Sequence, residues 1–134
     1  MNVEGLITLR SSFGHGETLA RFEAAVRANG MSVVARVDHA DGALETSVSL
    51  GATTLLMFGN RPGQAALVKA LRLIALELPF KMLIWQDAIG QTCISYTDFR
   101  WLATRYGAQR DDVYLFTDMA VMIDGIARKA GSPP

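Results

Sequence analysis

Three groups of polar residues in this sequence could carry chemistry. The first is Arg36-Val37-Asp38-His39, with Asp41 two residues further on. A histidine titrates near neutral pH, so an imidazole oriented by Asp38 could act as a general base. Neighbouring residues on a strand point to opposite faces, however. The same residues therefore also fit a strand that ends in a polar turn, in which Asp38 or His39 caps the next segment.

The second group lies in the turn Gly59-Asn60-Arg61-Pro62-Gly63, between an apolar run and a helical pattern. Gly59 could let a ligand approach the backbone, Asn60 could offer its amide, and Arg61 could bind a carboxylate or phosphate through two hydrogen bonds. A helix that starts after Pro62 would leave several N–H groups free for an anion. The turn lacks the spacing and the Lys-Ser/Thr pair of a P-loop. Its residues are equally those of an ordinary strand-to-helix turn.

The third group belongs to a predicted hairpin formed by residues 80–86 and 91–97. Lys81 and Trp85 alternate onto one face of its first strand, and Tyr96 lies on the second. Lys81 could anchor an anion or, if desolvated, act as a nucleophile, and Tyr96 could donate a hydrogen bond. The alternative is a solvent-facing surface on which the lysine stem covers Trp85.

The sequence gives no support for a metal or redox site. Cys93 is the single cysteine and has no Cys-x-x-Cys partner, which favours the role of a small buried apolar residue. His15, His39 and Cys93 are scattered, without the spacing of a zinc site. We therefore expect no metal and no other cofactor.

Composition indicates one globular domain. Half of the 134 residues are hydrophobic, and 13 basic residues balance 13 acidic ones. This balance argues against a nucleic-acid or anionic-membrane partner. A single cysteine, no secretory signal pattern and no apolar stretch of bilayer length favour a cytoplasmic protein. We expect one domain over residues 1–130, followed by a frayed tail at 131–134.

Hydrophobic periodicity predicts the elements that must position these groups. Strands are expected over residues 5–11, 31–38, 53–58, 80–86 and 91–97. Helices are expected over 17–29, 64–76, 98–106 and 111–130, with a short one around 41–47. Four apolar side chains should share one face of the second strand, namely Met31, Val33, Ala35 and Val37. Because the last two strands form a hairpin, the expected fold class is α+β, a single domain with a mostly antiparallel five-stranded sheet and helices packed on one face.

Four segments taken together resemble the domain of unknown function 302 family. They cover most of the chain in order: ETLARFEAAVRANG (17–30), RVDHADGA (36–43), TTLLMFGNRPGQAAL (53–67) and LPFKMLIWQDAIGQTCISYTDFRWLATRYG (78–107). The family pattern after the third strand resembles Phe-Gly-Asn-Pro, whereas Arg61 here stands between Asn60 and Pro62. Asp98-Phe99 stands where the family usually has Asx-Pro.

This resemblance implies a β-α-β-β-β-β-α-like fold, similar to the TATA-box-binding-protein-like arrangement, and a homodimer. It implies no established reaction. Similarity of fold to a DNA-binding protein does not confer DNA binding.

Three functional hypotheses are consistent with these observations. The first is a homodimeric module that binds a small polar or anionic ligand. Its contacts would be Arg36, His39, Asn60, Arg61, Lys81 and Tyr96. The second is a small enzyme that uses Asp38 and His39 as acid and base, with Lys81 stabilising charge. The third is a purely structural dimer, formed through the hairpin face around Trp85 or through the last helix.

Overall fold

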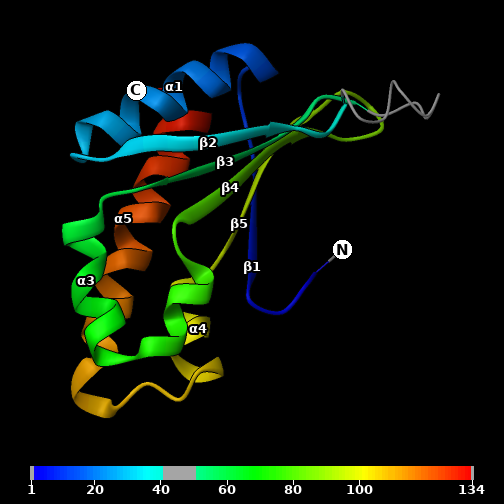
Figure 1. The fold of residues 1–134 in the computed structure, drawn as a ribbon. Helices are drawn as coiled ribbons and strands as arrows, with labels where there is room; N and C mark the ends of the chain where they lie inside the picture. Colours follow the sequence, from blue (N-terminus) through cyan, green and yellow to red (C-terminus); the bar gives the residue numbers. More distant parts are fainter. Residues whose placement is uncertain (1, 41–50, 134) are drawn as a thin grey trace.

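The computed structural model describes residues 2–40 and 51–133 and shows an α+β fold (Figure 1). The elements are β1 (Leu6–Arg10), α1 (His15–Ala28), β2 (Ser32–Asp38), β3 (Thr53–Gly59), α3 (Arg61–Ala70), the 3-10 helix η1 (Arg72–Glu77), β4 (Phe80–Gln86), β5 (Thr92–Thr97), α4 (Phe99–Arg105), the 3-10 helix η2 (Arg110–Asp112) and α5 (Val113–Gly131). Asp41 and the helix expected around 41–47 lie outside the described residues.

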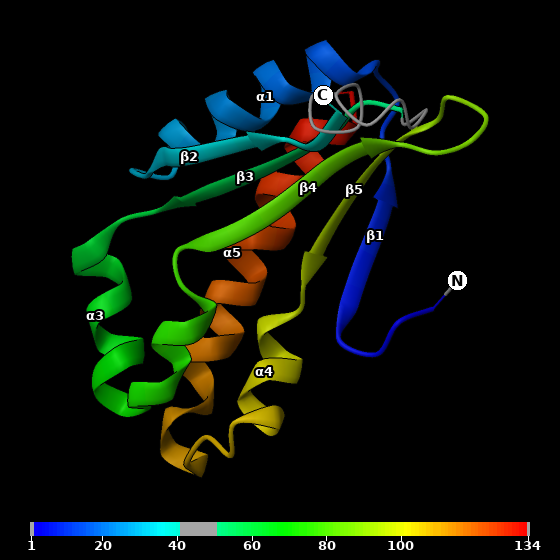
Figure 2. The same ribbon diagram turned by 45° about the vertical axis from the view of Figure 1, so that its right-hand side comes forward.

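The sheet has the strand order β1-β5-β4-β3-β2, and every neighbouring pair is antiparallel. This confirms the expected five-stranded antiparallel sheet. Helices α1 and α5 lie side by side against one face of it, while α3 and α4 extend beyond one end of the strands (Figures 1 and 2). The other face of the sheet carries no helix among the described residues.

A row of phenylalanine rings connects the sheet to the helices. Phe22 of α1 meets Phe58 of β3 edge to face, with ring centroids 5.2 Å apart. Contacts at 5.7, 5.2 and 6.4 Å continue the row through Phe80 and Phe99 to Phe116 of α5. All five rings are buried. Aromatic pairs at such separations stabilise a core beyond the area that they bury.

Local turn chemistry determines where several elements end. Asp98 caps α4 by accepting a hydrogen bond from the N–H of Arg100, and Gly30 ends the first helical unit with φ +73°. Gly90 supplies the positive φ of the hairpin loop. The expectation of one continuous helix over residues 64–76 was wrong. Leu71 adopts an extended backbone, φ −150°, which separates α3 from η1.

A β-bulge in β2 reverses the alternation of its side chains. Val33 pairs with Phe58, but Ala35 pairs with Met57, so one extra residue is inserted between them. The expectation of one shared apolar face was therefore wrong: Val33 faces the helices, whereas Ala35 faces away. A shift of one residue moves every later side chain to the opposite face. Residues 36 and 38 consequently point toward the helical side.

Candidate functional site

Asp38 is connected to a histidine, but the histidine is not its sequence neighbour. Its Oδ2 accepts a hydrogen bond from Arg36 Nε at 3.1 Å, and its Oδ1 accepts one from Thr54 Oγ1 at 2.9 Å. His15 Nε2, at the start of α1, lies 2.9 Å from the same Thr54 oxygen. His39 is exposed just after β2. The acid–base role predicted for Asp38 and His39 stays a prediction, and the imidazole in the observed network is His15.

Electrostatics sets the direction of these hydrogen bonds. Bonds from Arg36 and then Thr54 lower the pKa of Asp38, so its carboxylate accepts from the Thr54 hydroxyl. The hydroxyl oxygen then accepts from His15 Nε2–H. Burial, followed by the charge of Arg36, lowers the pKa of His15, although Asp38 opposes this. The neutral ring holds its lone pair on Nδ1, which is buried and has no hydrogen-bond partner within residues 2–40 and 51–133.

The polar residues predicted as one ligand site are spread over the molecule. Asp38 pairs with Thr54 at the start of β3, whereas Asn60 and Arg61 follow its end. Seven strand residues separate these ends by roughly 20 Å. Lys81 is exposed on the sheet face that the helices leave open.

Tyr96 takes part in a network that connects β5 to α4 and α5. Its hydroxyl donates to Asp124 Oδ1 at 2.6 Å, and Arg100 donates to Asp124 Oδ2 and to Asp98, both at 2.9 Å. Burial, then the hydrogen bond to Asp124, raises the pKa of Tyr96 well above its usual range. Because the phenol is neutral, buried and engaged, it holds elements together in this structure.

The open sheet face includes a cluster of hydrogen-bonded polar groups. Trp85 Nε1 donates to Ser95 Oγ at 2.9 Å, and Thr8 Oγ1 lies 2.8 Å from the same oxygen. Cys93 lies opposite Trp85 and is buried, as expected, and burial raises the pKa of its thiol. A protonated, buried thiol is a poor nucleophile.

The turn after β3 forms one wall of a cavity of about 380 Å³ that we name the α3 groove. It is lined by Gly30, Ser32, Val34, Gly59, Asn60, Arg61, Gln64 and Pro79. The Asn60 side chain fixes the turn, because its Nδ2 donates to the Gly30 carbonyl at 3.1 Å and its Oδ1 accepts from the Gly63 N–H at 3.4 Å. Of the predicted ligand contacts, the structure brings Asn60 and Arg61 together here.

The expectation of several free N–H groups at this helix start was wrong. Pro62 has none, and the N–H groups of Gly63 and Gln64 are bound to the side chain and the carbonyl of Asn60. Only the N–H of Arg61 remains in that turn among the described residues. The groove instead offers a side chain that sequence reasoning missed. Gln64 Nε2 is buried without a hydrogen-bond partner in the described part of the chain.

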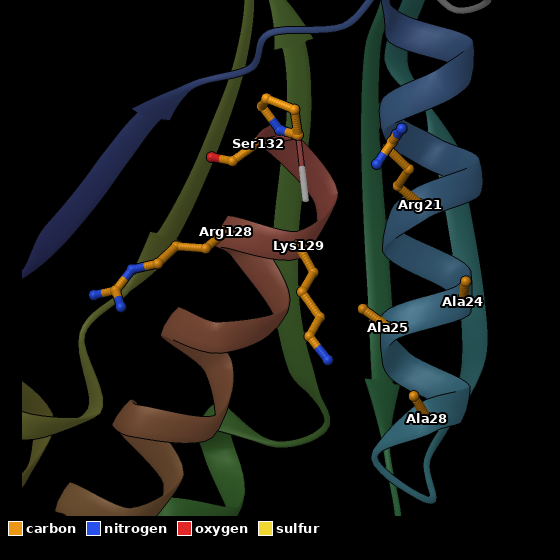
Figure 3. A pocket seen from close by; sticks show the side chains of 8 residues that line it. Arg21, Ala24, Ala25, Ala28, Arg128, Lys129 and Ser132 are labelled. Carbon is orange, nitrogen blue, oxygen red and sulfur yellow. The ribbon is translucent and has the colours of Figure 1, made fainter.

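A second cavity, of about 550 Å³, lies between α1 and the end of α5 (Figure 3). We name it the α1–α5 groove. It is lined by Arg21, Ala24, Ala25, Ala28, Arg128, Lys129, Ser132 and Pro133. Sequence reasoning singled out none of these residues and missed this site. The small residues of α1, spaced three and four apart, are the signal that a shallow channel runs along that helix.

Two classes of feature are absent from the described part of the chain. No helix within residues 2–40 and 51–133 has the length and apolar character to cross a bilayer. The same residues contain no group of three or more His, Cys, Asp or Glu side chains placed to hold a metal ion.

Comparison with known proteins places the chain in a family. The family model described as "Domain of unknown function DUF302" matches residues 7–129. The chain is also similar to an uncharacterized conserved DUF302 protein from Bacillus stearothermophilus. The two structures superpose with a TM-score of 0.85 at 18% identity, over 96% of this chain and 99% of the other. An identity this low supports the shared fold alone.

Two curated relatives are named fluoride-specific ion channel FluC 1. One comes from Brucella suis biovar 1 (strain 1330) and one from Brucella abortus biovar 1 (strain 9-941). Each is 37% identical over 117 residues, which is 87% of this chain. The match spans 44% of the first protein and 42% of the second, so the chain covers less than half the length of either.

Proposed function

Since the chain belongs to the DUF302 family, a family of domains without an assigned function, we propose from its geometry that it is a small binding module for an anionic ligand, held in the α3 groove. The observation that carries this proposal is the buried, unpartnered Nε2 of Gln64 beside the exposed Arg61. A buried donor without an acceptor costs about 1–3 kcal/mol, which an anionic oxygen would recover.

The charges around the groove favour an anion. Its lining includes Arg61 and no carboxylate, and the first turn of α3 contains no acidic residue. The positive end of the helix dipole adds to this field. Asn60 positions the turn, because its side chain is already bound to Gly30 and Gly63. Arg61 and Gln64 would therefore make the contacts with the ligand.

Gly59 leaves free the space that the Gln64 amide occupies. A Cβ built at position 59 would lie 2.3 Å from Gln64 Nε2, so a side chain there would displace the amide. Because the amide is the end of a flexible side chain, Gly59→Ala would leave the fold intact and move the proposed donor. This makes Gly59→Ala a test of the site that removes no charge.

Titration calorimetry with inorganic phosphate, sulfate, acetate and fluoride would test the proposal. Arg61→Gln and Gly59→Ala should each weaken binding of the preferred anion, and Arg61→Gln by about tenfold, the loss of one charge-assisted contact. Lys69→Gln is the matched control, since Lys69 is exposed in the last turn of the same helix. Equal binding by wild type and Arg61→Gln would contradict the assignment, as would no binding of any of the four anions.

Fluoride is part of this panel because of the two relatives that are named fluoride-specific channels. In each of these relatives, the segment that is similar to this chain makes up less than half of the length. We propose that such a segment acts as an anion-binding accessory to the remainder. A fluoride affinity that requires Arg61 would support this relation, and binding of phosphate without fluoride would count against it.

We also propose that the chain forms a homodimer through the open sheet face, since a second copy of the chain is the partner expected from the sequence. Apolar side chains from all five strands share this face: Leu6, Val37, Leu55, Met57, Leu83 and Trp85, with Cys93 between them. Five strands about 4.8 Å apart and some 20 Å long present roughly 500 Å² before side-chain relief is counted. This approaches the roughly 800 Å² per partner that a standard interface buries.

Sedimentation velocity over a dilution series would test the dimer. Leu83→Glu, at the centre of the face, should shift the population toward monomer. Leu73→Glu is the control, because Leu73 is 64% exposed in η1, away from the sheet. A wild-type monomer at every concentration would refute the proposal, and so would an equal effect of both substitutions.

A further inference from the structure

The α1–α5 groove combines an apolar wall with a cationic rim. Ala24, Ala25 and Ala28 of α1 form the wall, and their small side chains leave the space that the groove occupies. In Figure 3 the Lys129 side chain extends into the gap between the two helices, Arg21 lies on the α1 side, and Arg128 extends to the other side of α5. The lining residues include three cations and no carboxylate.

Arg21 is held in place but is not neutralised at close range. Its guanidinium lies 3.8 Å above the centre of the Phe13 ring, a cation–π arrangement that restricts its motion. The nearest carboxylate oxygen, on Glu17, is 3.9 Å from Nε and belongs to a side chain that is 56% exposed. Arg21 Nε is itself buried and has no hydrogen-bond partner in the described part of the chain. An exposed pair at that distance contributes little, so the guanidinium is available to another anion.

Lys129 is available for a different reason. A lysine near the end of a helix usually interacts with the last carbonyl groups. Here the Arg128 carbonyl accepts from the Ser132 N–H at 2.8 Å, and the Gly131 carbonyl accepts from the Ser12 N–H at 2.7 Å. Lys129 forms no ion pair within residues 2–40 and 51–133. Its ammonium can therefore serve a ligand in the groove.

We propose that the α1–α5 groove binds an amphiphilic anion, a molecule with one phosphate or carboxylate head and an apolar body of several carbons. The head lies between Arg21 and Lys129, and the body lies along Ala24 and Ala28. The cavity of about 550 Å³ is within the range of small-molecule sites. This site is on the helical side of the sheet and uses none of the residues of the α3 groove, so the two proposals can fail separately.

Octyl phosphate, used below its micelle concentration, is the probe, and titration calorimetry is the measurement. Inorganic phosphate supplies the head alone and octyl glucoside the tail without the charge. Wild type should bind octyl phosphate more tightly than either by at least about tenfold. Lys129→Gln should weaken the affinity for octyl phosphate by about fivefold. Ala28→Leu should also weaken it by filling the groove, and leucine is tolerated there because Ala28 is exposed.

Lys69→Gln is the matched control and should bind octyl phosphate as wild type does. Every comparison is repeated in an Arg61→Gln background, so that binding of the phosphate head in the α3 groove does not contribute. Circular dichroism confirms that each variant is folded before it is titrated. If inorganic phosphate bound as tightly as octyl phosphate, the proposal that the ligand has an apolar body would be overturned. If octyl glucoside bound as tightly, the proposal that the ligand has an anionic head would be overturned. Unchanged affinity in both Lys129→Gln and Ala28→Leu would overturn the location.

Discussion

Thr54 is the residue on which the His15–Asp38 network depends, and Thr54→Val tests it with almost no change of shape. The hydroxyl bonds to both His15 and Asp38, and Thr54 is 2% exposed. Valine leaves His15 Nε2 a part-buried donor without its partner, at a cost of about 1–2 kcal/mol. Solvent reaches the Asp38 carboxylate, whose side chain is 35% exposed, so water replaces its lost bond. The expected loss in the free energy of unfolding is therefore about 1–2 kcal/mol.

This loss can be measured as a shift in melting temperature. For 134 residues the entropy of unfolding is about 0.28 kcal/mol/K, so Thr54→Val should lower Tm by roughly 4–7 °C. Thr53→Val is the control with the same chemical change. Its hydroxyl bonds to the exposed Gly51 carbonyl, and its substitution should stay within about 0.5 kcal/mol of wild type. The reasoning would be refuted if the Tm of Thr54→Val lay within ~1 °C of the wild-type Tm, which is the error of the assay. It would also be refuted if Thr53→Val lowered Tm by the same amount.

Three further predictions concern stability. Gly5→Ala should lower the free energy of unfolding by more than about 2 kcal/mol in chemical denaturation, because Gly5 has φ +79° and a Cβ there would lie 2.3 Å from the Trp101 ring. Gly90→Ala is the control and should cost only about 1 kcal/mol, since Gly90 has φ +85° but no atom lies near the new Cβ. Equal losses for the two variants would show that the clash with Trp101 is relieved. Tyr96→Phe should cost about 1–2 kcal/mol by urea unfolding, since it removes the buried hydroxyl from Asp124, and no loss would show that Arg100 alone satisfies that carboxylate. The pKa of His15 in the folded protein is below its ordinary 6.5, so the unfolded chain binds more protons as the pH falls below 6.5. The contribution of His15 to the free energy of unfolding is therefore complete above pH 6.5 and is lost as the pH falls through the folded-state pKa. His15→Gln should therefore flatten the fall in the free energy of unfolding as the pH is lowered from 6.5, and an unchanged slope in urea titrations would contradict this assignment.

Local patterns were sufficient to predict most of the architecture. Alternation and the 3.6-residue period depend on neighbours in sequence, and they located the five strands, the main helices and the terminal hairpin. The strand-to-helix turn at Asn60 and Arg61 depends on equally local chemistry. The break at Leu71 was missed because a change of backbone direction there leaves the hydrophobic pattern unaltered.

The sequence by itself determined the fold class and the candidate turn at Asn60 and Arg61, because these depend on residues within a few positions of one another. Only the tertiary structure decided which side chains meet. The bulge in β2 turns Asp38 toward the helices, where Thr54 connects it to His15, while its neighbour His39 stays exposed. The α1–α5 groove likewise brings together residues from the two ends of the chain. Periodicity assigns a residue to a face, but register, bulges and helix packing determine what lies opposite that face, and these depend on contacts distant in sequence.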